Sequence, residues 1–153
     1  MKTKTQKGFT LVEVMIGIAA GAILLLAGGT ALVGGQRFWS NALIKANLQR
    51  DASYAMLRIS RSFKEGISAQ LDDYGRILRI HRKAGWIEFY SPQGTNDLYC
   101  QIEGQDPQTI ISGGVENVTY TLQNKLLRID VWLKKDNSQI HYVSTVMMRN
   151  YGG

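Results

Sequence analysis

The sequence of 153 residues contains little that would cross-link the chain or interrupt a helix. It has one cysteine, Cys100, so no disulfide can form within the chain, and a lone cysteine does not fix the redox compartment. Its two prolines, Pro92 and Pro107, both lie in the second half of the sequence. Because proline breaks a helix interior, the proline-free first 66 residues leave room for a long helix.

Residues that commonly carry catalysis are also scarce. The two histidines, His81 and His141, both fall inside expected strands, and the sequence has no HExxH, CxxC or phosphate-loop motif. Nothing in the sequence supports the proximity of Cys100 to either histidine, as a nucleophile pair would need. The adjacent carboxylates Asp72 and Asp73 could help to hold calcium, but such a pair on a turn is usually only solvated. The sequence therefore predicts no enzyme, no cofactor and no metal site.

Charge is missing from a long segment near the N-terminus. Residues 14–35 carry none, and these 22 residues are enough to cross a bilayer as a helix. Three lysines precede the segment, so the net charge of +6 falls to about +3 without them, and the basic balance says little about nucleic acid. One carboxylate, Glu13, lies at the mouth of this segment. An ionisable group is costly there, so Glu13 is a candidate functional residue.

The block Lys7-Gly8-Phe9-Thr10-Leu11-Val12-Glu13 resembles the N-terminal signature of the type IV prepilin family, which includes the pseudopilins of type II secretion. An ordinary secretory signal has a shorter apolar stretch with a cleavage site after it. An ordinary signal anchor would explain the length but has no use for Glu13. The prepilin resemblance accounts for the basic leader, the glycine, the carboxylate and the apolar run together.

The resemblance implies a role for each residue of the signature. A prepilin peptidase would cut between Gly8 and Phe9, which removes residues 1–8, and Phe9 would then be N-methylated. Glu13 would pair with the new amine of Phe9 on a neighbouring subunit. A buried carboxylate needs such a partner, since breaking a buried ion pair costs about 3–5 kcal/mol.

The resemblance also implies a location and a set of partners. Residues 9–35 would form a single-pass helix in the inner membrane and later the core of a filament, with the C-terminal domain outside the cytoplasm. The partners would be other pilins or pseudopilins and an inner-membrane assembly platform. Within the helix, Gly17 and Gly21 have the small-xxx-small spacing that lets helices approach closely, although glycine is also simply frequent in membrane helices.

The helical period continues beyond the apolar segment. Over residues 36–66 the apolar side chains recur at steps of three and four, which predicts an amphipathic helix packed on a domain by one face. Gly66 is a natural stop. The residues of this stripe are Ile44, Leu48, Ala52, Ala55, Ile59 and Phe63.

Residues 67–153 have the short alternating runs typical of strands. We expect strands at 76–81, 86–90, 98–102, 115–122, 127–133 and 140–148, with hairpins over 76–90 and 127–148. The segment 91–112 should be a looser connection around one short strand. The predicted fold class is α+β and pilin-like: a long N-terminal helix packed on a small antiparallel β-sheet.

Three stretches, at 49–63, 111–118 and 146–150, are similar to J-type minor pseudopilins and W-type minor pilins. The missing disulfide and the short variable region also favour a minor subunit over a major one. The sequence therefore predicts a structural subunit that helps to prime or cap a type IV pilus or a type II secretion pseudopilus.

The alternative function is DNA binding by a competence pilin. Arg76, Arg79, Arg82 and Lys83 precede Trp86, and such a cluster could contact phosphates and stack on a base. In the competing interpretation, which we favour, Arg76 and Arg82 share the solvent face of an edge strand, where basic residues deter pairing with other strands.

Overall fold

The computed structural model describes residues 10–149. Its helix α1, Leu11–Lys64, has 54 residues and confirms the long helix expected from the uninterrupted helical period. Arg61 and Lys64 lie in its last turn, where cations interact favourably with the negative end of the helix dipole. The chain divides after Ser40 into two compact units, so α1 contributes to both.

The first unit contains the apolar half of α1. No residue from Thr10 to Ser40 is buried, and large side chains such as Leu24 (72% exposed) and Leu25 (79% exposed) have no protein around them. Among the described residues, α1 is the helix that is long and apolar enough to span a membrane. Exposed apolar area on this scale requires lipid or other helices as its surroundings.

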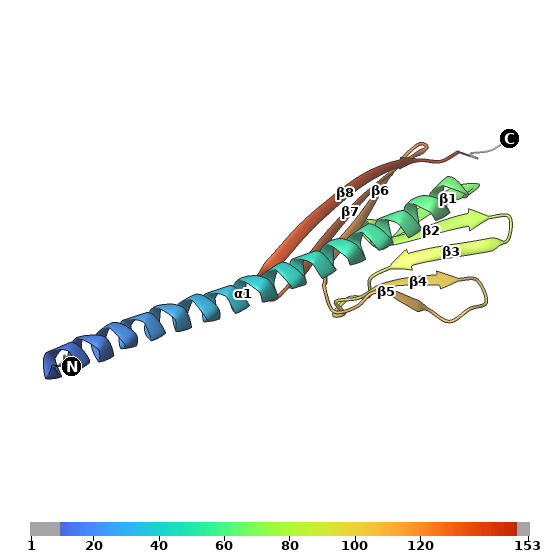
Figure 1. Cartoon of the computed structure of the whole chain (residues 1–153). Coiled ribbons are helices and arrows are strands. Elements are labelled where there is room, and N and C mark those ends of the chain that lie inside the picture. Colours follow the sequence, from blue (N-terminus) through green and yellow to red (C-terminus); the bar gives the residue numbers. More distant parts are fainter. Residues whose placement is uncertain (1–9, 150–153) are drawn as a thin grey trace, which may run out of the picture. The chain divides into compact units, whose positions relative to one another are not determined.

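The second unit combines the later turns of α1 with two antiparallel sheets (Figure 1). Strands of the first sheet follow the order β1-β2-β3-β4-β5, and those of the second follow the order β6-β7-β8. The short helix η1, Asp73–Gly75, joins β1 to β2. The strand bounds are β1 Ser68–Asp72, β2 Ile77–Arg82, β3 Gly85–Tyr90, β4 Leu98–Ile102, β5 Gln108–Ile111, β6 Val115–Gln123, β7 Leu126–Lys135 and β8 Ser138–Met147.

The predicted α+β class and antiparallel pairing are confirmed, and all six expected strands are present within a few residues of their expected bounds. Two further strands, β1 and β5, were not expected. The five residues of β1 include a single large apolar side chain, Leu71, and β5 has only four residues, so neither shows a clear alternation. The strands also form two sheets and not the single sheet that was expected, because no strand of the first sheet pairs with β6, β7 or β8.

The predicted stripe on α1 forms the centre of the core. Ala52, Ala55, Ile59 and Phe63 are fully buried, Leu48 is nearly so, and Ile44 is partly buried at the margin. The inner faces of both sheets contribute to the same cluster, for example Phe89 from β3 and Ile129 from β7. Burying each large apolar side chain stabilises the fold by about 1.5–3 kcal/mol, so the stripe fixes how α1 sits on the sheets.

Two short connections hold the sheets to each other. The carbonyl oxygen of Asn96 accepts hydrogen bonds from the backbone N–H groups of Gly114 and Val115, both at 2.9 Å. On the other side, Gly75 in η1 lies directly against the backbone of Tyr120 in β6. The positions of β1 and β2 relative to β6 therefore depend on a close backbone approach.

Candidate assembly site and basic cluster

The helix α1 begins with a capping box formed by Thr10 and Glu13. The backbone N–H and the hydroxyl of Thr10 both donate to Oε2 of Glu13, at 2.8 and 3.0 Å. The backbone N–H of Glu13 in turn donates to Oγ1 of Thr10 at 3.3 Å. This reciprocal arrangement satisfies two of the N–H groups that have no partner within a helix at its N-terminus. In lipid, which offers them no partner, the box is worth more than in water.

The capping box uses only one oxygen of the Glu13 carboxylate. Among the described residues, no hydrogen bond or ion pair reaches the other oxygen, Oε1. Glu13 was expected to be a functional residue, but its local partner Thr10 was not predicted. The signal was available, since Thr followed three residues later by Glu before an apolar run is the sequence pattern of a capping box.

The other residues expected to act in processing and helix packing give less structural information. Gly8 and Phe9 lie outside the described residues. Gly17 and Gly21 lie one turn apart on α1, and apart from their chain neighbours and the adjacent helix backbone no atom lies within 4 Å of where a Cβ would stand at either position. A second helix therefore has room to approach both glycines, as their proposed packing role requires.

The basic cluster expected on one surface is divided between the two faces of the first sheet. Leu78 and Ile80 of β2 are fully buried, and strand alternation places Arg82 on their face and Arg79 on the opposite one. Arg82 is partly buried and its Nε has no hydrogen-bond partner, whereas Lys83 is exposed in the β2–β3 turn.

Two expectations about this cluster are wrong. The strand β2 is not an edge strand, because β1, which the sequence did not reveal, pairs along it. Arg82 also does not share a solvent face with the exposed Arg76, because it lies on the inner face of β2. The proposal that these basic residues deter pairing at a sheet edge therefore fails.

Arg79 is engaged within its own domain. Its guanidinium lies 2.7 Å from Oε1 of Glu88 and 4.0 Å from Oδ2 of Asp72, and it stands 5.5 Å from the centre of the Trp86 ring. The Glu88 side chain is only 12% exposed, so Arg79 supplies the countercharge that this carboxylate needs. Trp86 and Arg79 thus lie together as expected, but they contact each other and are not both free to contact a nucleic acid.

Cys100 and His141 lie on different sheets, Cys100 in β4 and His141 in β8. Cys100 is 1% exposed, and burial raises the pKa of its thiol, an effect that nearby Arg58 and Arg82 partly offset. Such a thiol is a poor nucleophile. His141 stacks on Trp132 with 3.7 Å between ring centres. In the described part of the chain, no three potential ligands gather that could hold a metal, Asp72 and Asp73 included.

Comparison with known proteins identifies the N-terminal segment. A family model described as the prokaryotic N-terminal methylation motif matches residues 3–29. No curated protein and no solved structure matches the chain. The matched residues include the expected cleavage position, Glu13 and the first part of the apolar half of α1.

The chain therefore carries the N-terminal signal of a type IV pilin-like prepilin. The signal implies processing by a prepilin peptidase and association with other pilins. Together with the exposed apolar half of α1, it supports membrane anchoring and incorporation into a pilus-type filament. The match points to a structural subunit, and it does not identify a particular kind of pilin.

Proposed function

We propose that this chain is a minor pilin or pseudopilin, a structural subunit that helps to initiate or cap a type IV pilus or a type II secretion pseudopilus. One observation carries the proposal: Glu13 stands at the start of an apolar helix with Oε2 held by Thr10 and with no bond from any described residue to Oε1. Between Thr10 and Gln36 it is the only charged side chain.

The open oxygen supports pairing between subunits. Cleavage after Gly8 would create an α-amine on Phe9, one residue before the capping box. A neighbouring subunit displaced along the filament axis would bring its own Phe9 amine to Oε1. Because an unpaired carboxylate in lipid is costly, only a limited set of axial offsets is tolerated. The pair would thus set the register between subunits.

The globular domain supports the minor role through a surface that could meet other subunits. The outer face of β7 and β8 exposes bulky apolar side chains, namely Leu126 (46%), Val143 (46%) and Met147 (61%). The charges beside them are largely neutralised, since Arg128 contacts Asp130 at 2.8 Å. Such a face suits specific contacts with a few partners.

The test separates capping from ion pairing at Glu13. Glu13→Gln keeps an amide oxygen that can accept from Thr10 but removes the negative charge, and Glu13→Ala removes both. We expect both variants to be cleaved after Gly8 and both to be strongly reduced in filaments. The readout is mass spectrometry of the methylated Phe9 peptide in sheared filaments and in membranes. Normal incorporation of Glu13→Gln would refute the ion pair and leave Glu13 a capping residue only.

Cleavage itself tests the broader assignment. If the leader peptide stays attached to the wild-type chain in cells with an active prepilin peptidase, the chain is an anchored domain and not a filament subunit. If the methylated Phe9 peptide is found only in membranes, a short pseudopilus or an assembly primer is favoured over a surface pilus.

The geometry of the basic cluster does not favour DNA uptake. Arg79 is committed to Glu88 and Arg82 is on the inner face of its strand, which leaves Arg76 and Lys83 as the exposed cations of the cluster. Two cations give weak, sequence-independent phosphate binding. DNA binding with a steep salt dependence that is lost in Arg76→Glu/Lys83→Glu would reverse this preference.

A further inference from the structure

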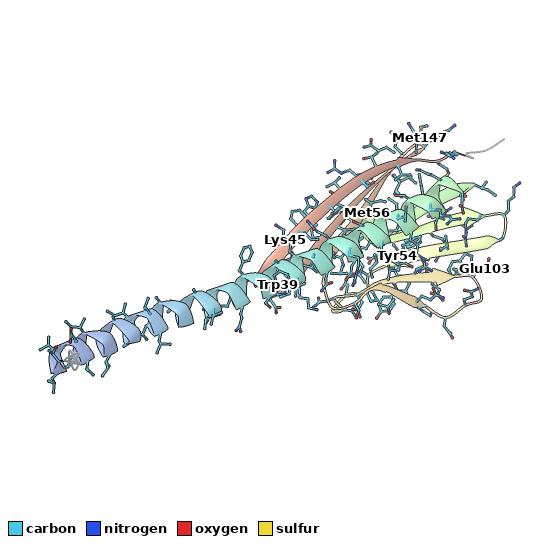
Figure 2. The ribbon with its side chains drawn as sticks, viewed as in Figure 1. Trp39, Lys45, Tyr54, Met56, Glu103 and Met147 are labelled. Carbon is cyan, nitrogen blue, oxygen red and sulfur yellow. The ribbon has the colours of Figure 1, made fainter. Side chains whose placement is uncertain are left out.

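A groove lies where the end of α1 meets the segment that follows β8. Its volume is about 540 Å³, and it lies beyond Met147, which Figure 2 labels at the end of β8. We call it the helix-end groove. It is lined by Leu57, Ser60, Arg61, Lys64, Glu65 and Arg149.

The cations of the helix-end groove outnumber its anions. Arg61 is paired with Glu65, with 3.1 Å between Nε and Oε1. Lys64 and Arg149 have no hydrogen bond or ion pair with any described residue. The helix dipole accounts for a cation in the last turn of α1, and therefore for Lys64. It does not account for Arg149, which comes from a distant part of the sequence.

An apolar side chain stands beside these charges. Leu57 is 69% exposed at the groove. Tyr54, which Figure 2 labels, lies one turn earlier on α1 and is 53% exposed. Isolated exposed apolar residues are common on protein surfaces. Here the two lie on the helical face that leads into a groove with two cations that no described residue pairs. The occupant that fits is therefore a segment with carboxylates next to an apolar side chain.

A second copy of this chain offers one exposed segment of this kind, Asp72-Asp73-Tyr74, but Asp72 lies 4.0 Å from Arg79 of its own chain. All 12 of its acidic residues are described, and nine of them accept a hydrogen bond or form an ion pair within the chain. Of the three others, Asp73 belongs to this segment, and Asp106 and Asp136 lie singly on two other turns. A second copy would also present the same unpaired cations.

Nucleic acid fits the helix-end groove less well than an acidic protein segment. Proteins that bind DNA through its backbone typically neutralise about 6–10 phosphates, whereas the groove offers two unpaired cations. Phosphates also gain nothing from the exposed Leu57. Charge complementarity and the apolar contact together select an acidic protein surface.

We propose that the helix-end groove docks an acidic segment of a different pilin-type subunit, with carboxylates on Lys64 and Arg149 and an apolar side chain on Leu57. The proposal rests on the proposed function, because it assumes that the chain assembles with other subunits. It adds the location of a contact that distinguishes one partner subunit from another.

The experiment uses full-length chains in detergent, with each of the other prepilin-type subunits of the source organism as a probe. Lys64→Glu/Arg149→Glu reverses both of these cations, and Lys45→Glu/Lys135→Glu makes the same change in charge at exposed lysines elsewhere. We expect the first variant to weaken binding to one subunit by about tenfold or more at low salt. The control variant should bind as the wild type does. Equal melting temperatures would show that both variants are folded.

A charge swap completes the test. Replacing acidic residues of the bound subunit by lysine should restore the affinity of Lys64→Glu/Arg149→Glu. The proposal is overturned if no subunit distinguishes this variant from the control, if the variant loses only self-association, or if it loses only DNA binding. Cleavage and filament incorporation of the wild type are measured in parallel. If the groove variant binds every subunit as the control does while the wild type is cleaved and incorporated normally, the proposed function still stands. An uncleaved wild type overturns that function itself.

Discussion

Replacing Gly75 by alanine should destabilise the globular domain by about 3 kcal/mol, roughly twice the effect of the same change at Gly94. Gly75 has a φ of +83°, a left-handed conformation that costs a residue with a side chain about 1–2 kcal/mol. A Cβ at this position would also lie 2.6 Å from the carbonyl oxygen of Tyr120. Because that oxygen belongs to the backbone of β6, it cannot rotate away as a side chain would.

The clash adds a second cost to the conformational one. Forcing extra atoms into a packed site typically costs about 1–3 kcal/mol, so the two contributions together give about 2–5 kcal/mol. Gly94 provides the matched control. Its φ is +81°, and nothing lies within 4 Å of where its Cβ would be. Gly94→Ala therefore measures the conformational cost alone, about 1–2 kcal/mol.

The assay is urea unfolding of the full-length chain in detergent, followed by circular dichroism in the strand region. The difference between the two variants isolates the contact between η1 and β6, which sets how the two sheets meet. Equal losses of unfolding free energy in Gly75→Ala and Gly94→Ala would refute the close backbone approach, and with it this account of how the sheets are joined.

Two further predictions concern charged side chains of the domain. The hydrogen bond from Arg128, helped by His141, lowers the pKa of Asp130, so wild type should be more stable than Asp130→Asn at neutral pH. This advantage should decline as the pH falls below the unfolded value of about 3.9 and vanish below the folded pKa, which acid unfolding of both chains measures. Arg79→Ala should cost about 1–2 kcal/mol because it strips Glu88 of its countercharge, whereas Lys83→Ala should be neutral in the same urea assay. Equal stability of the two alanine variants would mean that Arg79 is available for other partners.

The parts of the fold that follow a strict period could be predicted from sequence. The stripe from Leu48 to Phe63 keeps a helical spacing, and β7 alternates apolar and polar residues throughout. β1 and β5 could not, because neither is long enough to show a period. Their omission had a consequence beyond the strand count, since without β1 the strand β2 was taken for a sheet edge.

The candidate sites divide in the same way. The roles predicted for Gly8, Phe9 and Glu13 rest on one contiguous signature, and they stay predictions. Arg79 could not be assigned correctly, since its partner Glu88 lies on the next strand and becomes its neighbour only through the pairing of β2 with β3. The helix-end groove could not be predicted from the sequence for the same reason, because its lining combines residues of α1 with Arg149, which is distant in the sequence.

The distribution of charge indicates which part of the chain can discriminate between partner subunits. Between Thr10 and Ser40 only Glu13 and Arg37 are charged, and the large side chains exposed there are apolar. An interface with one carboxylate can fix an axial register, but it cannot reject a subunit with the same signature, because rejection requires a mismatched charge or shape. Selection must therefore come from residues beyond Ser40. Lys64 and Arg149 meet that requirement, because a partner without carboxylates at the helix-end groove would leave two cations desolvated and unpaired.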